Sequence, residues 1–252
     1  MAPTNVLITG ANSGLGLAIA KVLVRASENF HVILASRSRD KAQAALDEIE
    51  AGGPKGSVSI LQLDVTNEES INEATGYVQE HFGYLDVLIN NAAVGCLDVD
   101  DVKTRFQCCL ETNVLGPAMV SAAFRHLLLK SANPYSIFVG TGARSLPRNA
   151  IQQPPSHFNH IRNGDAYQVS KAALNMLAVL EARDYGPQGI KVFVLSPGLF
   201  RSNLRGTSEE AKSGWGKAED PEGAAEVVLS ILQGNRDSEV GQLIHKDGVY
   251  EW

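Results

Sequence analysis

Cysteine is scarce in this sequence, and long apolar runs are missing from it. Of the 252 residues only three are cysteine, namely Cys96, Cys108 and Cys109. Their number and spacing do not fit a disulfide framework or a zinc site, so we expect a reducing, intracellular compartment. The loop histidines His157 and His160 have no carboxylate or cysteine pattern around them, so no metal site is expected.

No apolar run reaches the roughly 18 residues that a membrane-spanning helix needs. A strand pattern begins within a few residues of Met1, which leaves no room for a signal peptide. Basic residues are not in excess either, since 22 lysines and arginines face 28 acidic residues and give a formal charge of −6. Nucleic acids and anionic membranes both attract basic surfaces. The sequence therefore predicts neither partner, and it predicts a cytoplasmic location.

Short, β-branched apolar runs alternate with longer helical patterns along the whole chain. The strand patterns lie at residues 6–9, 31–35, 58–63, 85–89, 136–139, 191–195 and 242–244, and the helix patterns at 15–27, 39–51, 68–82, 103–131, 165–185 and 221–233. This alternation predicts an α/β fold with repeated βαβ units. We expect a doubly wound, seven-stranded parallel sheet with helices on both faces.

Two polar segments, 142–164 and 201–220, interrupt this alternation. Both would leave the carboxyl ends of strands, where open α/β sheets bind ligands, and long loops there are usually functional. We expect them to be insertions that shape a substrate mouth, with Phe158, Ile161 or Trp215 lying over it.

A glycine-rich loop follows the first strand pattern and opens the first helix pattern. Its sequence is Thr9-Gly10-Ala11-Asn12-Ser13-Gly14-Leu15-Gly16. Glycines let such a loop approach a pyrophosphate, whose charge is stabilised by the N–H groups at the helix N-terminus. Because strand, loop and helix occur in the required order, the loop predicts dinucleotide binding in a Rossmann-like fold.

Tyr167 and Lys171 lie four residues apart in a predicted helix, and positions i and i+4 share one helix face. An ammonium group near a phenol favours the ionised phenol and lowers its pKa from roughly 10 towards neutrality. The pair therefore indicates a proton donor and acceptor suited to reversible carbonyl–alcohol chemistry.

Six motifs follow one another in the order known from one enzyme family. They are the Gly-xxx-Gly-x-Gly loop, Asp64-Val65, Asn90-Asn91-Ala92-Ala93, Asn113-Val114-Leu115-Gly116, Tyr167-xxx-Lys171 and Pro197-Gly198. Together they resemble the short-chain dehydrogenase/reductase family, from residue 4 to about residue 248. The resemblance implies one NAD(P)-binding Rossmann domain over 1–252, and a homodimer or homotetramer formed through the helices at 103–131 and 165–185.

The resemblance also implies a cofactor site. Asp64 would bond the adenine amino group, and Val65 would lie beside the ring. Ser202 stands where the family usually has Thr, and Ala93 where it usually has Gly, so some backbone adjustment is expected near Ala93. The implied cofactor contacts are Gly10, Asn12, Ser13, Gly14, Leu15, Gly16, Arg37, Asp64, Val65, Asn90, Ala92, Tyr167, Lys171, Pro197, Gly198, Phe200 and Ser202.

In this family a Tyr is the acid/base, a Lys lowers its pKa, and an Asn holds a water of the proton relay. The resemblance assigns these roles to Tyr167, Lys171 and Asn113. A Ser usually orients the substrate oxygen, and here either Thr141 or Gly142 takes its place. We expect Thr141, because its hydroxyl can donate and accept as Ser does. A glycine would remove one donor, which can cost about 10²–10³ in rate; Ser145 is a third, poorer candidate.

The choice of cofactor depends on the end of the second strand pattern, Ala35-Ser36-Arg37-Ser38-Arg39. A carboxylate there would bond a 2′-hydroxyl and repel a 2′-phosphate. No carboxylate occurs before Asp40, and Arg37 offers a planar donor group that suits phosphate. The sequence favours NADP(H) over NAD(H).

These observations predict an NADP(H)-dependent oxidoreductase that interconverts a small ketone and a secondary alcohol, with Tyr167 as acid/base. Two alternatives stay open. The altered Ser position and the long 142–164 segment would also suit a family member that uses bound NADP(H) in a non-redox elimination, epimerisation or cyclisation. The other alternative is a non-catalytic regulator that senses NADPH.

Overall fold

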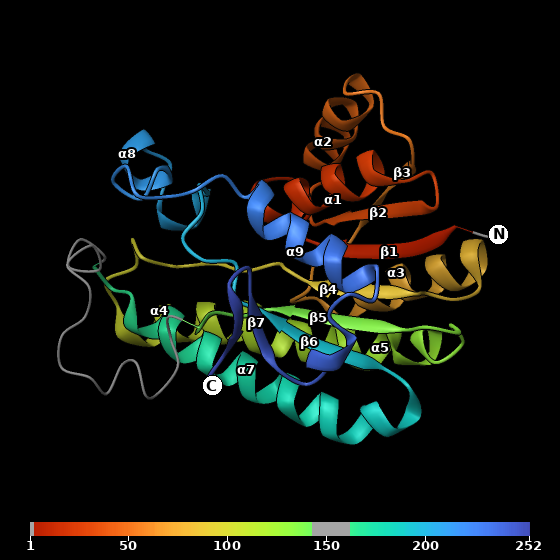
Figure 1. The fold of residues 1–252 in the computed structure, drawn as a ribbon. Coiled ribbons are helices and arrows are strands. Elements are labelled where there is room, and N and C mark those ends of the chain that lie inside the picture. The colour runs from red at the N-terminus through yellow and green to blue at the C-terminus, as the bar shows by residue number, and fades with distance from the viewer. Residues whose placement is uncertain (1–2, 143–161) are drawn as a thin grey trace.

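A single eight-stranded sheet forms the centre of the molecule, with strand order β3-β2-β1-β4-β5-β6-β7-β8 (Figure 1). The structure is a computed structural model that describes residues 3–142 and 162–252. The strands are β1 Thr4–Thr9, β2 Phe30–Ser36, β3 Ser57–Gln62, β4 Val87–Asn90, β5 Tyr135–Val139, β6 Lys191–Leu195, β7 Leu243–His245 and β8 Gly248–Tyr250. The pairings from β3 through β7 are all parallel.

The predicted count of seven parallel strands omits β8. This short strand pairs antiparallel with β7 after a two-residue turn, in the register His245↔Gly248. Lys246 and Asp247 form this turn, and Gly248 is the first residue of β8. Unlike the buried β7, β8 has no buried residue, so it carries no apolar run that would mark a strand in the sequence.

Helices cover both faces of the sheet, as predicted (Figure 1). They are α1 Gly14–Ala26, α2 Arg39–Ala51, α3 Glu68–Phe82, α4 Val102–Leu110, α5 Gly116–Leu128, α7 Asp165–Tyr185, α8 Glu209–Lys212 and α9 Glu222–Leu232. One core packs α1, α2 and α9 against the sheet, and a second core packs α3, α5 and α7 against the opposite face. Neighbouring residues of one strand, such as Val6 and Leu7, enter opposite cores, because side chains alternate along a strand.

The predicted helix over 103–131 is broken in the middle. A π-helical turn, Glu111–Leu115, separates α4 from α5. Pro117 lies in the first turn of α5, and proline has no N–H to donate to the carbonyl four residues earlier. The carbonyl of Asn113 therefore receives no α-helical bond from position 117. Such wide turns occur frequently at functional sites.

The expectation that the cysteines form no disulfide is wrong. Cys96 and Cys108 are bonded, with their Cα atoms 6.7 Å apart, and Cys109 is a buried free thiol. Cys96 and Cys108 are 12 positions apart in the sequence, and the carbonyls of Val99 and Asp100 between them accept hydrogen bonds from Arg105 of α4. A count of cysteines in the sequence does not reveal this contact. No helix among the described residues is long and apolar enough to span a membrane.

Candidate active site

The carboxyl ends of the parallel strands form one edge of the sheet, and the predicted site residues follow those ends. Gly10 follows β1, Arg37 follows β2, Asp64 follows β3, Asn90 ends β4, Thr141 follows β5, and Pro197 follows β6. Parallel pairing brings all six positions to the same edge.

The glycine loop packs tightly against the residues after β4. Gly10 has φ +65°, and a Cβ atom there would lie 3.0 Å from the Cα of Ala92. A Cβ at Gly16 would lie 2.6 Å from Asn91 Nδ2, so neither position accepts a side chain without movement. The loop is also bonded to this segment, because the Asn91 side chain donates to the Thr9 carbonyl at 2.8 Å.

Within the described residues the Ser13 side chain does not cap the N-terminus of α1, so this side chain leaves the first N–H groups of the helix available to a ligand. Ser202 approaches Gly14 there, since a Cβ at Gly14 would lie 3.8 Å from Ser202 Cβ. Within the described parts of the chain, Ser202 Oγ and Asn90 Oδ1 are buried without a hydrogen-bond partner. A helix N-terminus, a buried hydroxyl and a buried carbonyl oxygen suit the phosphates and ribose hydroxyls of a dinucleotide. The residues present fit the predicted cofactor.

Asp64 and Val65 follow β3 and are held in place by neighbouring residues. Asp64 Oδ1 accepts hydrogen bonds from the Thr66 N–H and from Thr66 Oγ1, at 3.0 and 2.7 Å. Val65 packs against Gly116, where an added Cβ would lie 2.9 Å from Val65 Cγ2. This contact joins the segment after β3 to the start of α5.

The end of β2 points a cation towards solvent. Arg37 is exposed and forms no ion pair with any residue that the structure describes. Next to it, Ser36 Oγ donates to Asn12 Oδ1 at 3.1 Å, which fixes the glycine loop against β2. Leu15, in contrast, sends its side chain into the core, so only its backbone could contact a cofactor.

Helix α7 carries Tyr167 and Lys171 past the end of β5. Lys171 is 2% exposed, and its Nζ donates to the Val139 carbonyl at 2.8 Å. The same Nζ lies 5.9 Å from the centroid of the half-buried Tyr167 ring. Burial lowers the pKa of Lys171 to about 8, and nearby Cys109 opposes this shift. The ammonium group is therefore desolvated and close to the phenol, as the i, i+4 spacing predicts.

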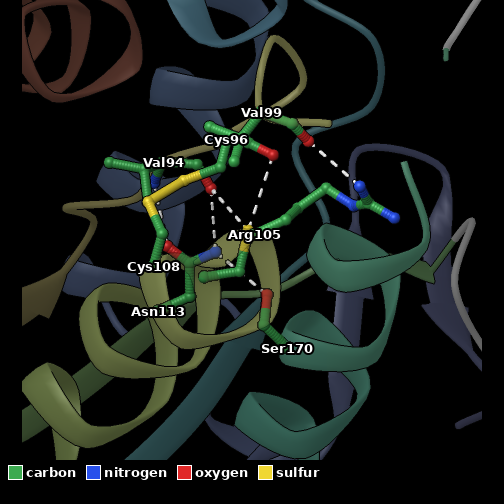
Figure 2. Close-up of a disulfide and its surroundings, with 9 residues drawn as sticks. Val94, Cys96, Val99, Arg105, Cys108, Asn113 and Ser170 are labelled. Carbon is green, nitrogen blue, oxygen red and sulfur yellow. Dashed lines mark hydrogen bonds between the residues drawn. A yellow bond between two sulfur atoms is a disulfide. The ribbon is translucent and has the colours of Figure 1, made fainter. Parts of the chain in front are cut away.

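Asn113 is fully buried in the π-helical turn and links three elements. Its Oδ1 accepts from the Val94 N–H at 2.8 Å, and its Nδ2 donates to the Val94 carbonyl and to Ser170 Oγ, both at 2.9 Å (Figure 2). Ser170 Oγ donates in turn to the Tyr167 carbonyl at 2.8 Å. These bonds hold the Asn113 side chain, so the part of Asn113 available to a water is its backbone. The sequence motif did not reveal the role of Ser170.

The geometry after β5 distinguishes Thr141 from Gly142. Gly142 is buried, its N–H donates to Ser196 Oγ at 2.9 Å, and a Cβ there would lie 2.4 Å from Tyr250 Cδ2. Position 142 therefore faces the C-terminal hairpin. Thr141 is half-buried, and its carbonyl accepts from Asn175 of α7 at 3.5 Å, so its backbone lies beside the helix that carries Tyr167. The third candidate, Ser145, lies outside the described residues.

The 201–220 segment brings another cation towards Tyr167. Arg205 donates to the carbonyls of Phe200, Ala211 and Lys212 at 2.7, 3.0 and 2.9 Å. Burial lowers the pKa of Arg205, while its electrostatic interaction with Tyr167 raises it. No sequence motif indicated Arg205, because its position depends on how the segment folds around it.

The remaining predicted residues follow β6 or belong to the two polar segments. Gly198 has φ +76° and lies near His245, and Phe200 forms a bridge with Glu219. Trp215 is 38% exposed on the 201–220 segment. The histidines His157 and His160, together with Phe158 and Ile161, lie outside the described residues. Among those described, no cluster of potential metal ligands occurs.

Comparison with known proteins is consistent with this geometry. A family model described as short chain dehydrogenase matches residues 4–152. The chain is 31% identical over 255 residues to a short-chain dehydrogenase/reductase, tropE, from Talaromyces stipitatus, covering 96% of this chain and 95% of that protein. It is also 31% identical over 247 residues to the short-chain dehydrogenase anuI from Penicillium roqueforti, covering 97% and 94% of the two chains.

A solved structure shares the fold over the whole length. The crystal structure of an NADPH-bound carbonyl reductase from chicken fatty liver superposes with a TM-score of 0.80, at 26% sequence identity and with all of both chains covered.

Proposed function

Because the chain belongs to the short-chain dehydrogenase/reductase family, we propose that it is an NADP(H)-dependent enzyme that interconverts ketones and secondary alcohols. Family membership makes it an NAD(P)-dependent oxidoreductase that acts on CH–OH or C=O groups. Family membership alone does not fix the preference for NADP(H), the substrate class or the role of each residue, and these are the proposed parts.

The buried Lys171 beside Tyr167 is the observation that supports this chemistry most directly. An ammonium group with 2% exposure costs free energy that an exposed lysine does not. Its position 5.9 Å from the phenol ring lets it stabilise a phenolate, so Tyr167 can exchange a proton with an alcohol or ketone oxygen near neutral pH.

Thr141 and Asn113 complete the proposed catalytic set. The Thr141 hydroxyl would orient the substrate oxygen towards Tyr167, because Gly142 has no side chain and faces Tyr250. Asn113 would hold a relay water through its backbone carbonyl, since its side chain is occupied by Val94 and Ser170.

The glycine loop, Asp64, Asn90 and Ser202 would hold the dinucleotide. When bound, its nicotinamide supplies or accepts the hydride. The exposed Arg37 at the end of β2 suits a 2′-phosphate and supports the preference for NADP(H). A structural neighbour with 26% identity is an NADPH-bound carbonyl reductase, which agrees with this choice.

Two further properties are part of the proposal. A homodimer or homotetramer would form through α4, α5 and α7, which present an exposed apolar face. Residues 1–252 would form one domain that works in the cytoplasm.

NADPH oxidation by the purified protein tests the function. We expect absorbance at the reduced-nicotinamide wavelength to fall with members of a ketone and aldehyde panel. Tyr167→Phe should reduce the rate to background, and Tyr185→Phe should not, since Tyr185 ends the same helix, where Arg125 lies 3.7 Å over its ring. Full activity in Tyr167→Phe would rule out the proposed acid/base.

A further inference from the structure

The disulfide joins the segment after β4 to helix α4, and it lies beside Asn113 of the proposed catalytic set (Figure 2). We call residues 94–100 the β4 segment. Cys96 lies in this segment, and Cys108 lies in the last turn of α4. Both cysteines are partly exposed, so an external thiol can reach the bridge.

A short chain of hydrogen bonds leads from the β4 segment to Tyr167. Val94, two residues before Cys96, exchanges two hydrogen bonds with the Asn113 side chain at 2.8 and 2.9 Å. Asn113 donates to Ser170, which donates to the Tyr167 carbonyl. A shift of the β4 segment therefore changes the bonding of two residues of the proposed catalytic set.

Other contacts hold the same segment against its neighbours. Arg105 donates to the carbonyls of Val99 and Asp100 at 3.0 and 3.1 Å, and it forms an ion pair with Asp165 at the start of α7. On another side, a Cβ at Gly95 would lie 2.5 Å from the Leu204 carbonyl oxygen. The β4 segment is thus packed between α4, the start of α7 and the 201–220 segment.

Cys109 does not compete for the bridge. It follows Cys108 directly, but it is fully buried, and its Sγ donates to the Gly95 carbonyl at 3.5 Å. Burial raises the pKa of its thiol, and a protonated thiol is a poor nucleophile in disulfide exchange. The pairing of Cys96 with Cys108 therefore stays defined, and opening it requires an external reductant.

We propose that Cys96–Cys108 is a redox-active site that takes a dithiol reductant and sets how firmly the β4 segment supports the catalytic residues. A dithiol thiolate attacks one sulfur, the Cys96–Cys108 bond breaks, and a mixed disulfide forms. The second thiol of the reductant closes its own disulfide, so the dithiol is oxidised by two electrons and the protein gains two thiols. In reducing compartments, disulfides are usually transient and redox-sensing, which agrees with this role.

The effect on catalysis rests on the proposed oxidoreductase function, whereas the effect on the β4 segment does not. Opening the bridge removes the covalent link between the β4 segment and α4, so we expect the backbone of Val94 and its neighbours to open to solvent more often. A misplaced catalytic group can lower the rate by about 10²-fold. We expect kcat/KM to fall about tenfold on reduction, since the hydrogen bonds partly hold the geometry.

The experiment compares oxidised protein with protein reduced by dithiothreitol. Thiol counting after denaturation should give one thiol before reduction and three after it, because Cys109 alone is unpaired and the chain has three cysteines. Hydrogen exchange should become faster at residues 94–100, and kcat/KM should fall for NADPH with the carbonyl that is turned over fastest.

Two variants serve as controls. The double variant Cys96→Ser/Cys108→Ser should have the kcat/KM and the hydrogen exchange of reduced protein, and neither should change when dithiothreitol is added. Cys109→Ala keeps the bridge and should respond as the unaltered chain does.

Reduction can be tested on the unaltered chain, so the result does not depend on whether a variant folds. Three thiols in protein purified without reductant, or unchanged exchange at residues 94–100 after full reduction, would overturn the inference. Faster exchange with an unchanged kcat/KM would overturn the link to catalysis. A chain that turns over no carbonyl but shows the exchange change would refute the proposed function and support the redox site.

Discussion

Lys171 places an ammonium group where water is nearly excluded, and this burial has a cost in stability. Its pKa falls from 10.5 to about 8. Between these two pH values the unfolded chain binds more protons than the folded chain, so the free energy of unfolding rises with pH across this window. Below pH 8 the cost is fully present and amounts to about 3 kcal/mol.

Lys171→Met should therefore change how stability depends on pH. We expect the stability of the variant relative to the unaltered chain to fall by about 3 kcal/mol as the pH rises from 7 towards 10.5, since only the unaltered chain gains stability there. Urea denaturation at several pH values measures this difference. Lys130→Met is a matched control, because Lys130 also donates to a backbone carbonyl but is exposed. Parallel curves for Lys171→Met and the unaltered chain would show that Lys171 is not desolvated.

Arg37 decides the preference between cofactors if its guanidinium contacts a 2′-phosphate. Arg37→Asp should weaken NADPH binding by about 1.5–3 kcal/mol, the usual contribution of a charge-assisted hydrogen bond, and should improve binding of NADH. Fluorescence titration with both cofactors measures the change. Arg39→Asp alters the same charge two residues later, at the start of α2, and should leave the ratio of the two affinities almost unchanged. An equal loss of NADPH affinity in both variants would mean that the overall charge of this surface, and not a contact with Arg37, sets the preference.

The order of the elements was predictable from local patterns, and their interruptions were not. The strand patterns match β1 to β7, and α1, α2, α3 and α7 lie within one residue of their predicted bounds. Hydrophobic periodicity carries that information, because each of these elements buries one or both faces. The π-helical turn before Pro117 continues the helical pattern on both sides of it, and β8 has no buried residue, so neither changes the apolar pattern. The family likeness was also predictable, because the residue types of its motifs are set by their chemistry.

The candidate site was predictable where a residue acts through a short motif, and not where it acts through a distant contact. The Tyr167–Lys171 spacing correctly predicts a shared helix face. The bridge between Cys96 and Cys108 and the position of Arg205 depend on how separate segments fold against one another. The assignment of each cofactor contact remains a prediction.

The glycine loop is the element that connects β1 to α1, and its shape can be tested with a matched pair of glycines. Gly10 and Gly53 both have φ +65°, but only Gly10 lies close to another segment, while nothing lies within 4 Å of a Cβ at Gly53. Alanine at either position costs about 1–2 kcal/mol of backbone strain. Gly10→Ala should in addition weaken NADPH binding at least about tenfold, because the loop must move away from Ala92.

Thermal denaturation and NADPH titration of both variants separate the two effects. Both variants should lose stability through backbone strain, and Gly53→Ala should keep normal NADPH affinity. Normal affinity in Gly10→Ala as well would exclude the loop from the cofactor site.

At the scale of the whole molecule, one outer face is unusually apolar. Leu110, Leu115, Val169 and Met176 are 37%, 53%, 49% and 56% exposed. They belong to α4, α7 and the π-helical turn between α4 and α5, and these helices lie on the same side of the sheet (Figure 1). A groove lined by Gln107, Leu110, Glu111, Val114, Leu115 and Ala118 runs over this face. Exposed apolar patches of this kind usually mark protein–protein contacts.

A second copy of the chain is the proposed occupant, since the family resemblance implies assembly through these helices. Leu115→Glu should therefore weaken self-association at least about 100-fold, because a charge would be buried at the centre of the contact. Sedimentation velocity over a range of protein concentrations measures this change. Leu129→Glu, at the end of α5 and also exposed, should leave the assembly intact. If the unaltered chain sediments as a monomer at micromolar concentration, the apolar face has another function and the site must be complete within one chain.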